Sequence, residues 1–108
     1  MALDRSAIVL PELPREEVDV PELGGAVLVR GLLLRQRMEF FSALRETEDR
    51  YVMLAKLLHM TVVGPDDKPL LSEAEWERFG GVHFAAAIAL FNAAERLSGL
   101  NPEDAAKN

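Results

Sequence analysis

The sequence contains no cysteine, only two histidines and few aromatic residues. Without cysteine the chain forms no disulfide bond and no thiolate metal site, which fits a reducing compartment. His59 and His83 are far from the i, i+4 spacing of paired zinc ligands. We therefore expect neither a metal centre nor any other cofactor.

Positive charge is also scarce, because 18 acidic residues outnumber 12 basic ones and give a formal net charge of −6. Nucleic acid and anionic membrane surfaces both attract clusters of Lys and Arg, so we expect neither as a partner. The N-terminus lacks a signal-peptide pattern. The most apolar stretch, Tyr51 to Val63, is shorter than the about 20 residues that span a bilayer. We expect a soluble cytosolic protein.

Catalytic motifs are missing as well. Ser42, Ser72 and Ser98 have no positioned base in the sequence. Gly24-Gly25 and Gly80-Gly81 are not followed by the lysine and serine of a phosphate-binding loop. The usual criteria for an active site are not met, so we expect no enzyme.

The segment from Tyr51 to Val63 is the feature around which the chain is organised. Only Lys56, His59 and Thr61 interrupt its apolar character. A helix that is apolar nearly all round is normally buried among other elements. We expect a central core helix that becomes extended near Val62-Val63. The alternative is that part of this helix faces another subunit or a partner.

Residues 17–32 predict a β-hairpin. Val18 and Val20 alternate with acidic residues, which is typical of a half-buried strand. Pro21 to Gly25 supplies the turn, and Ala26 to Val29 the return strand. Because a lone hairpin is marginally stable in water, it must lie on helices or on the sheet of another chain. A very short second hairpin between 62–63 and 70–71 is also plausible around the turn at 64–69.

Three further helices are predicted from apolar periodicity and capping residues. The first runs from Leu34 to about Arg45, and residues 46–50 form either a joint or a continuation of it. Ser72 and Glu75 form a capping box that opens a helix over 73–79, and Gly80-Gly81 is expected to end it. The last helix covers 82–98. The expected inner faces of the first and last helices are Leu34, Met38, Phe41, Leu44 with Phe40 beside them, and Phe84, Ile88, Phe91, Ala94, Leu97.

The fold class that follows is mainly α, a small helical domain with an N-terminal β-hairpin, and α+β at most. We expect one domain over residues 15–100, an N-terminal arm over 1–14 and a C-terminal tail over 101–108. Pro11 and Pro14 prevent a helix in the arm, whose apolar residues pack either on their own domain or on a neighbour. Gly99 is expected to cap the last helix, and Asn101 to Asp104 have the pattern of a new helix start.

Surplus apolar side chains in a short acidic chain indicate self-association, so we expect a homo-oligomer that forms rings or open spirals. Seven apolar or aromatic residues are the candidates for partner binding or self-association. They are Leu10, Leu28, Leu54, Leu58, Trp76, Phe79 and Phe91.

Several stretches, in their order along the chain, resemble the tail assembly chaperones of long-tailed, siphovirus-type bacteriophages and prophages. The resemblance covers roughly residues 15–108. It is carried by the hairpin over 18–32, the helix start over 35–40, the segments 65–70 and 72–76, and the end over 90–100 and 103–108. The order of these patterns carries the resemblance, because none is a catalytic signature.

The resemblance implies a non-enzymatic chaperone. Such proteins are thought to coat the long, apolar tape measure protein, keep it soluble, help recruit the tail tube protein, and leave before the virion is finished. The alternatives are a generic acidic helical adaptor or regulatory interaction domain, and a small enzyme subunit. The first predicts a stable monomer, and the second needs a pocket with convergent polar groups.

The resemblance also implies a second, longer form of the chain. Residues Ala106-Lys107-Asn108 can be encoded by a heptamer on which ribosomes slip back by one nucleotide. Proteins of the family are often extended by such a programmed frameshift at this point. The helix start at 101–104 would then join an extension present only in the minor form. An ordinary frayed terminus is the simpler alternative.

Overall fold

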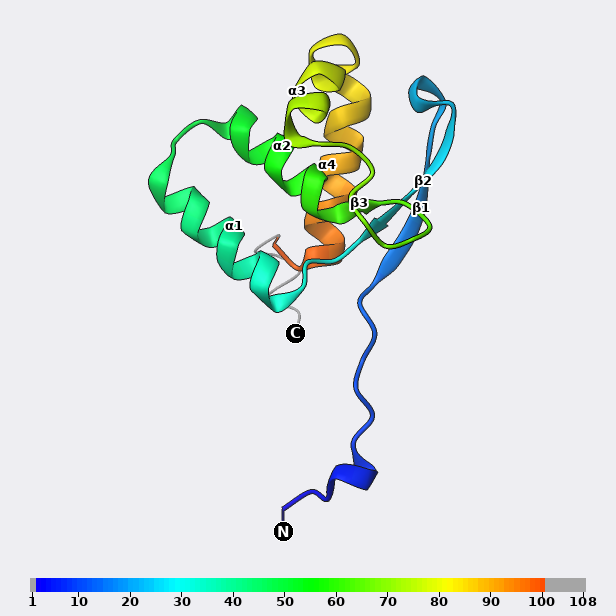
Figure 1. The fold of residues 1–108 in the computed structure, drawn as a ribbon, viewed down its shortest axis with the longest axis vertical. Helices are drawn as coiled ribbons and strands as arrows, with labels where there is room; N and C mark the ends of the chain where they lie inside the picture. Colours follow the sequence, from blue (N-terminus) through cyan, green and yellow to red (C-terminus); the bar gives the residue numbers. More distant parts are fainter. Residues whose placement is uncertain (1, 101–108) are drawn as a thin grey trace.

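The computed structural model describes residues 2–100 (Figure 1). Short 3-10 turns lie at Arg5–Ala7 and Pro21–Leu23. The regular elements are β1 (Arg15–Val20), β2 (Gly25–Arg30), α1 (Leu34–Glu46), α2 (Arg50–Thr61), β3 (Val62–Val63), α3 (Glu73–Val82) and α4 (Phe84–Ser98). This combination of helices with one small antiparallel sheet confirms the expected fold class.

The hairpin forms as predicted and acquires a third strand. β1 and β2 pair in antiparallel register with Val18 opposite Val27, and the turn closes through Gly24, whose φ of 96° suits glycine. β3 pairs with β2 through Leu28 and Val29. The sequence indicated that 62–63 is extended but not that it joins the hairpin. The expected second hairpin with 70–71 is reduced to one bridge between Val63 and Pro69.

The core surrounds α2, as the apolar run predicts. Leu57, Leu58, Val62 and Trp76 are all buried, together with Leu90 of α4. Of the two possibilities for residues 46–50, the joint is correct. The chain leaves helical geometry at Thr47, and the Asp49 carboxylate accepts from the backbone N–H groups of Tyr51 and Val52 to open α2. An N-cap aspartate of this kind satisfies amides that a helix start leaves unpaired.

The predicted capping box opens α3. Ser72 N–H donates to Glu75 Oε1 at 3.0 Å, and Glu75 N–H donates to Ser72 Oγ at 3.1 Å. The expected end of this helix at Gly80-Gly81 is wrong, because α3 continues to Val82. Neither Gly80 nor Gly81 adopts the left-handed conformation of a helix cap, and a Cβ on Gly80 would make ordinary van der Waals contact, 3.5 Å from Cβ of Ala87.

The C-terminus of α4 is capped as predicted. Gly99 adopts the left-handed conformation with φ 65°, and the N–H of Leu100 donates to the Glu95 carbonyl at 3.0 Å. Leu100 packs against the core cluster. The helix-start pattern over 101–104 lies outside the described residues, and so does the rest of the predicted tail.

The N-terminal arm runs away from the body of the domain (Figure 1). It is anchored where Gly31 N–H donates to the Pro14 carbonyl at 3.0 Å and Arg15 Nη1 lies 2.8 Å from Asp67 Oδ1. Beyond this anchor most apolar side chains of the arm are exposed in this conformation, and Leu13 is half-buried. Val9 is 90% exposed and Leu10 is 80% exposed.

Candidate functional site

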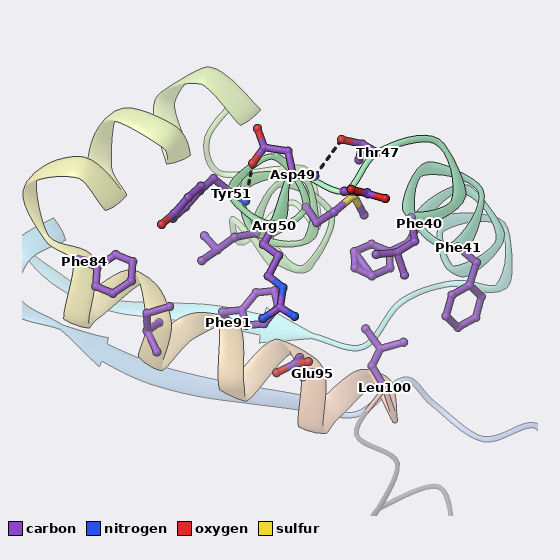
Figure 2. A pocket seen from close by; sticks show the side chains of 15 residues that line it. Phe40, Phe41, Thr47, Asp49, Arg50, Tyr51, Phe84, Phe91, Glu95 and Leu100 are labelled. Atoms are coloured by element: carbon purple, nitrogen blue, oxygen red, sulfur yellow. Dashed lines mark hydrogen bonds between the residues drawn. The ribbon is translucent and has the colours of Figure 1, made fainter.

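An open apolar groove lies between α1, the start of α2, and α4 (Figure 2). Its volume is about 1030 Å³. Aromatic and aliphatic side chains line most of it, with charged side chains from the 47–50 joint and from α4. The lining residues are Phe40, Phe41, Leu44, Thr47, Glu48, Asp49, Arg50, Tyr51, Met53, Leu54, Phe84, Ile88, Phe91, Glu95 and Leu100.

The α1 wall exists because most of the expected inner face of α1 is not buried. Leu34, Met38, Phe41 and Leu44 are 76%, 59%, 38% and 46% exposed, whereas Phe40 is buried at 5%. Phe40 places α1 on the core, with the partly buried Ala43 beside it, and the apolar side chains named above stay exposed. The predicted inner face is therefore wrong, and part of it, Phe41 and Leu44, forms one side of the groove.

The α4 wall arises from the same mismatch between periodicity and burial. α4 packs on the core through Ala87, Leu90 and Ala94, all at 0% exposure. Of the expected inner face only Ala94 belongs to this buried set. Phe84 is 57% exposed, and Ile88 and Phe91 are half-buried. These last three side chains line the groove, and Phe84 and Phe91 point into it from α4 (Figure 2).

The charges of the groove are mostly acidic. Glu48, Asp49 and Glu95 stand against the single cation Arg50 among the lining residues. Partial burial raises the pKa of the Glu95 carboxyl above its ordinary value. An apolar floor with an acidic rim suits an apolar, neutral or basic segment, and it rejects an acidic one.

Among residues 2–100 no group of three or more His, Asp or Glu side chains is placed to hold a metal ion. His59 Nδ1 lies 2.9 Å from the Leu71 carbonyl oxygen, so the ring donates there and ties α2 to the segment before α3. His83 separates α3 from α4, with its ring 5.3 Å from that of Phe79. In the described part of the chain, no helix is long and apolar enough to cross a membrane.

The structure separates the seven candidate residues into three groups. Leu54 and Phe91 line the groove, and their role in partner binding stays a prediction. Leu58 and Trp76 are completely buried in the domain's own core, so they are not available to a partner in this conformation. Phe79 is half-buried and packs edge-on against Trp76, with ring centroids 5.6 Å apart.

The other two candidates lie away from the groove. Leu28 lines a second hollow between the hairpin and residues 63–71. Leu10 is exposed on the arm. The sequence analysis did not select Phe41, Leu44, Tyr51, Phe84 and Ile88, which complete the groove. A signal for these residues was present in the sequence, because α1 and α4 both carry more apolar residues than one core-facing side needs.

The fold, a small antiparallel sheet beside four helices, places the chain in the class of small α+β domains. No protein-family model and no curated protein sequence matches it. Among solved structures it is similar to the tail assembly chaperone of bacteriophage HK97, with a TM-score of 0.55 and 16% sequence identity. The match covers 81% of this chain and 86% of that one. At this identity the likeness concerns the fold, which agrees with the fold implied by the resemblance in the sequence.

Proposed function

We propose that this chain is a phage tail assembly chaperone that binds apolar helical segments of the tape measure protein in the groove between α1 and α4. The observation that carries the proposal is the groove itself, with aromatic and aliphatic side chains from two facing helices left open to solvent. The likeness in fold to the HK97 tail assembly chaperone supports the same role.

The chemistry of the groove suits an amphipathic helix. Such a helix lays side chains three and four positions apart into a hydrophobic groove, where burial of each large side chain stabilises the complex. The α4 wall of the groove has apolar side chains at the same spacing, namely Phe84, Ile88 and Phe91. The chain's net charge of −6 would keep a coated tape measure protein in solution.

The function is one of binding rather than catalysis. In this proposal the chaperone acts in the cytoplasm of the host cell, helps recruit the tail tube protein, and is absent from the finished virion. The longer, frameshifted form stays a prediction. The codons of Lys107 and Asn108 test it, because any choice other than the slippery heptamer removes the slip site.

Co-expression tests the proposal. The tape measure protein of the same phage genome is produced with the native chain, with Leu44→Glu/Phe84→Glu, or with Leu70→Glu. Leu70 is 41% exposed and lies outside the groove, which makes it a matched control. We expect the native chain and the control to keep the tape measure protein in the soluble fraction. The groove variant should lose this ability while remaining folded by circular dichroism.

Equal solubilisation by all three proteins would refute the role of the groove. Failure of the native chain to retain any tape measure protein would favour the generic adaptor instead.

A further inference from the structure

We propose that the N-terminal arm of one copy occupies the groove of a second copy, and that the tape measure protein must displace it. This inference rests on the proposed function for its second half. The first half concerns only two parts of this chain, an exposed apolar arm and an open apolar groove. It goes beyond self-association because it names the segment of one copy that covers the groove of the other.

The arm exposes several apolar side chains to solvent, as a segment that binds another surface does. Leu3, Val9 and Leu10 are 78%, 90% and 80% exposed, and Ile8 is 49% exposed. Pro11 and Pro14 disfavour helical geometry at the residues before them, Leu10 and Leu13, so this part of the arm can dock without first unfolding a helix. Among the described residues, the hydrogen bonds of residues 2–13 are all made within the arm itself.

The arm leaves its own domain at a fixed point. Residues 14 and 15 are tied to Gly31 and Asp67, and the chain before them runs away from the groove-bearing helices (Figure 1). Fully extended, residues 2–13 would reach at most roughly 40 Å, since each adds about 3.3 Å. The arm runs along the longest axis of the molecule and forms part of its 56 Å extent, so it projects far enough to reach a neighbour.

The low net charge of the arm makes it a better match for the acidic groove than other segments of this acidic chain are. The groove carries three carboxylates against one arginine. Residues 2–10 contain one acid, Asp4, and one base, Arg5, so they bring no net charge to that rim. The groove and the arm are both apolar, and the three consecutive residues Ile8, Val9 and Leu10 offer the side chains to fill it. Docking would cover exposed apolar surface on both partners.

Cross-linking between differently tagged copies tests the contact, and the absence of natural cysteine leaves no background. A Leu10→Cys chain is mixed with a Phe84→Cys chain or with an Ala74→Cys chain, and a short bismaleimide is added. Ala74 is exposed on α3 outside the groove and serves as the control. We expect a mixed dimer with Phe84→Cys and little with Ala74→Cys.

No mixed dimer, or equal yields at both positions, would overturn the proposal. So would a Leu10→Cys/Phe84→Cys double variant that cross-links only within single chains, because the arm would then occupy its own groove.

The second measurement addresses displacement. Val9→Asp/Leu10→Asp changes two exposed side chains, so the fold should be unaffected. We expect its self-association constant, measured by sedimentation, to fall by roughly tenfold or more, the loss expected from one buried Val or Leu side chain. Retention of the co-expressed tape measure protein should persist or increase, because a competitor has been removed. A parallel loss of retention would mean that the arm holds the client, and would overturn displacement.

The two hypotheses fail in distinguishable ways. Groove-dependent retention without cross-linking of the arm would remove this inference and leave the proposed function intact. If the arm cross-links to the groove but the groove variant retains the tape measure protein as well as the native chain does, the proposed function is removed and the contact between the arm and the groove stands.

Discussion

At the scale of single residues, Trp76 is the side chain on which the core depends most. It is 0% exposed, lies in the same cluster as Leu58, and packs edge-on against Phe79. Its indole N–H has no hydrogen-bond partner among the described residues, so packing must outweigh the cost of burying that group.

Trp76→Ala is therefore expected to lower the free energy of unfolding by about 3–5 kcal/mol, the usual cost of removing a large aromatic residue from a filled core. Urea unfolding followed by circular dichroism measures it. Tyr51→Ala is the matched control, because Tyr51 is 72% exposed and should change stability by less than about 0.5 kcal/mol. A loss below about 1 kcal/mol for Trp76→Ala would contradict its position in the core.

Glu95 gives the groove a pH dependence. Its pKa is raised by burial, so the folded chain binds this proton more tightly than the unfolded chain does. The contribution of Glu95 to the free energy of unfolding therefore declines as the pH rises from the unfolded pKa to the folded one. Glu95→Gln should remove that decline, and it should also strengthen binding of apolar segments near neutral pH.

Unfolding titrations of both proteins between about pH 4 and 7 measure the difference, with Glu77→Gln as a surface control. Two other carboxyl groups act in the opposite direction. The Arg15 guanidinium, donating a hydrogen bond, lowers the pKa of Asp67, and the Ser72 backbone N–H lowers that of Glu75. Both are present in all variants and cancel in the comparison. Identical pH profiles for Glu95→Gln and the native chain would contradict the prediction.

At the scale of elements, the approach of the sheet to α4 depends on Gly31. A Cβ at this position would lie 2.7 Å from the backbone oxygen of Leu97 and 3.4 Å from the Pro14 ring. Gly31→Ala must push the hairpin away from the helix end and should cost about 1–3 kcal/mol. Gly25→Ala is the matched control, since nothing lies within 4 Å of its Cβ position. Thermal unfolding of the two variants measures the contrast, and equal midpoints would refute it.

The elements that the sequence predicts well are those with local causes. The hairpin follows from alternation and a Pro-Gly turn, and α3 begins at Ser72 because a capping box is complete within four residues. The end of α3 was mispredicted because Gly80 and Gly81 stay in helical geometry and do not adopt the left-handed conformation that caps a helix. Likewise, no local sequence signal predicts that β3 pairs with β2, because the two strands are far apart in the sequence.

The groove also depends on tertiary packing that local sequence patterns do not reveal. Periodicity identifies the apolar faces of α1 and α4 but does not say which element, if any, covers them. Leu54 and Phe91 were selected as partner residues and line the groove, whereas Leu58 and Trp76 were selected for the same reason and fill the core. An apolar residue has the same local signature in both places, and only the packing of α2 against α3 and α4 separates them.

At the scale of the whole molecule, the chain combines three features with different tasks. The chain carries a net charge of −6, an apolar groove stays open between α1 and α4, and an apolar arm runs away from the body of the domain (Figure 1). Exposed apolar patches of this kind mark interaction sites in soluble proteins. We therefore expect the groove to bind either the arm of a second copy or a segment of the client.

Site-specific photo-cross-linking tests the central claim most directly, because it reports contact rather than stability. A photoreactive phenylalanine analogue replaces either Phe84 in the groove or Leu70 outside it, and the chain is co-expressed with the tape measure protein of the same genome. The account predicts an adduct with the tape measure protein from position 84 and little or none from position 70. An adduct only from position 70, or equal adducts from both, would contradict it.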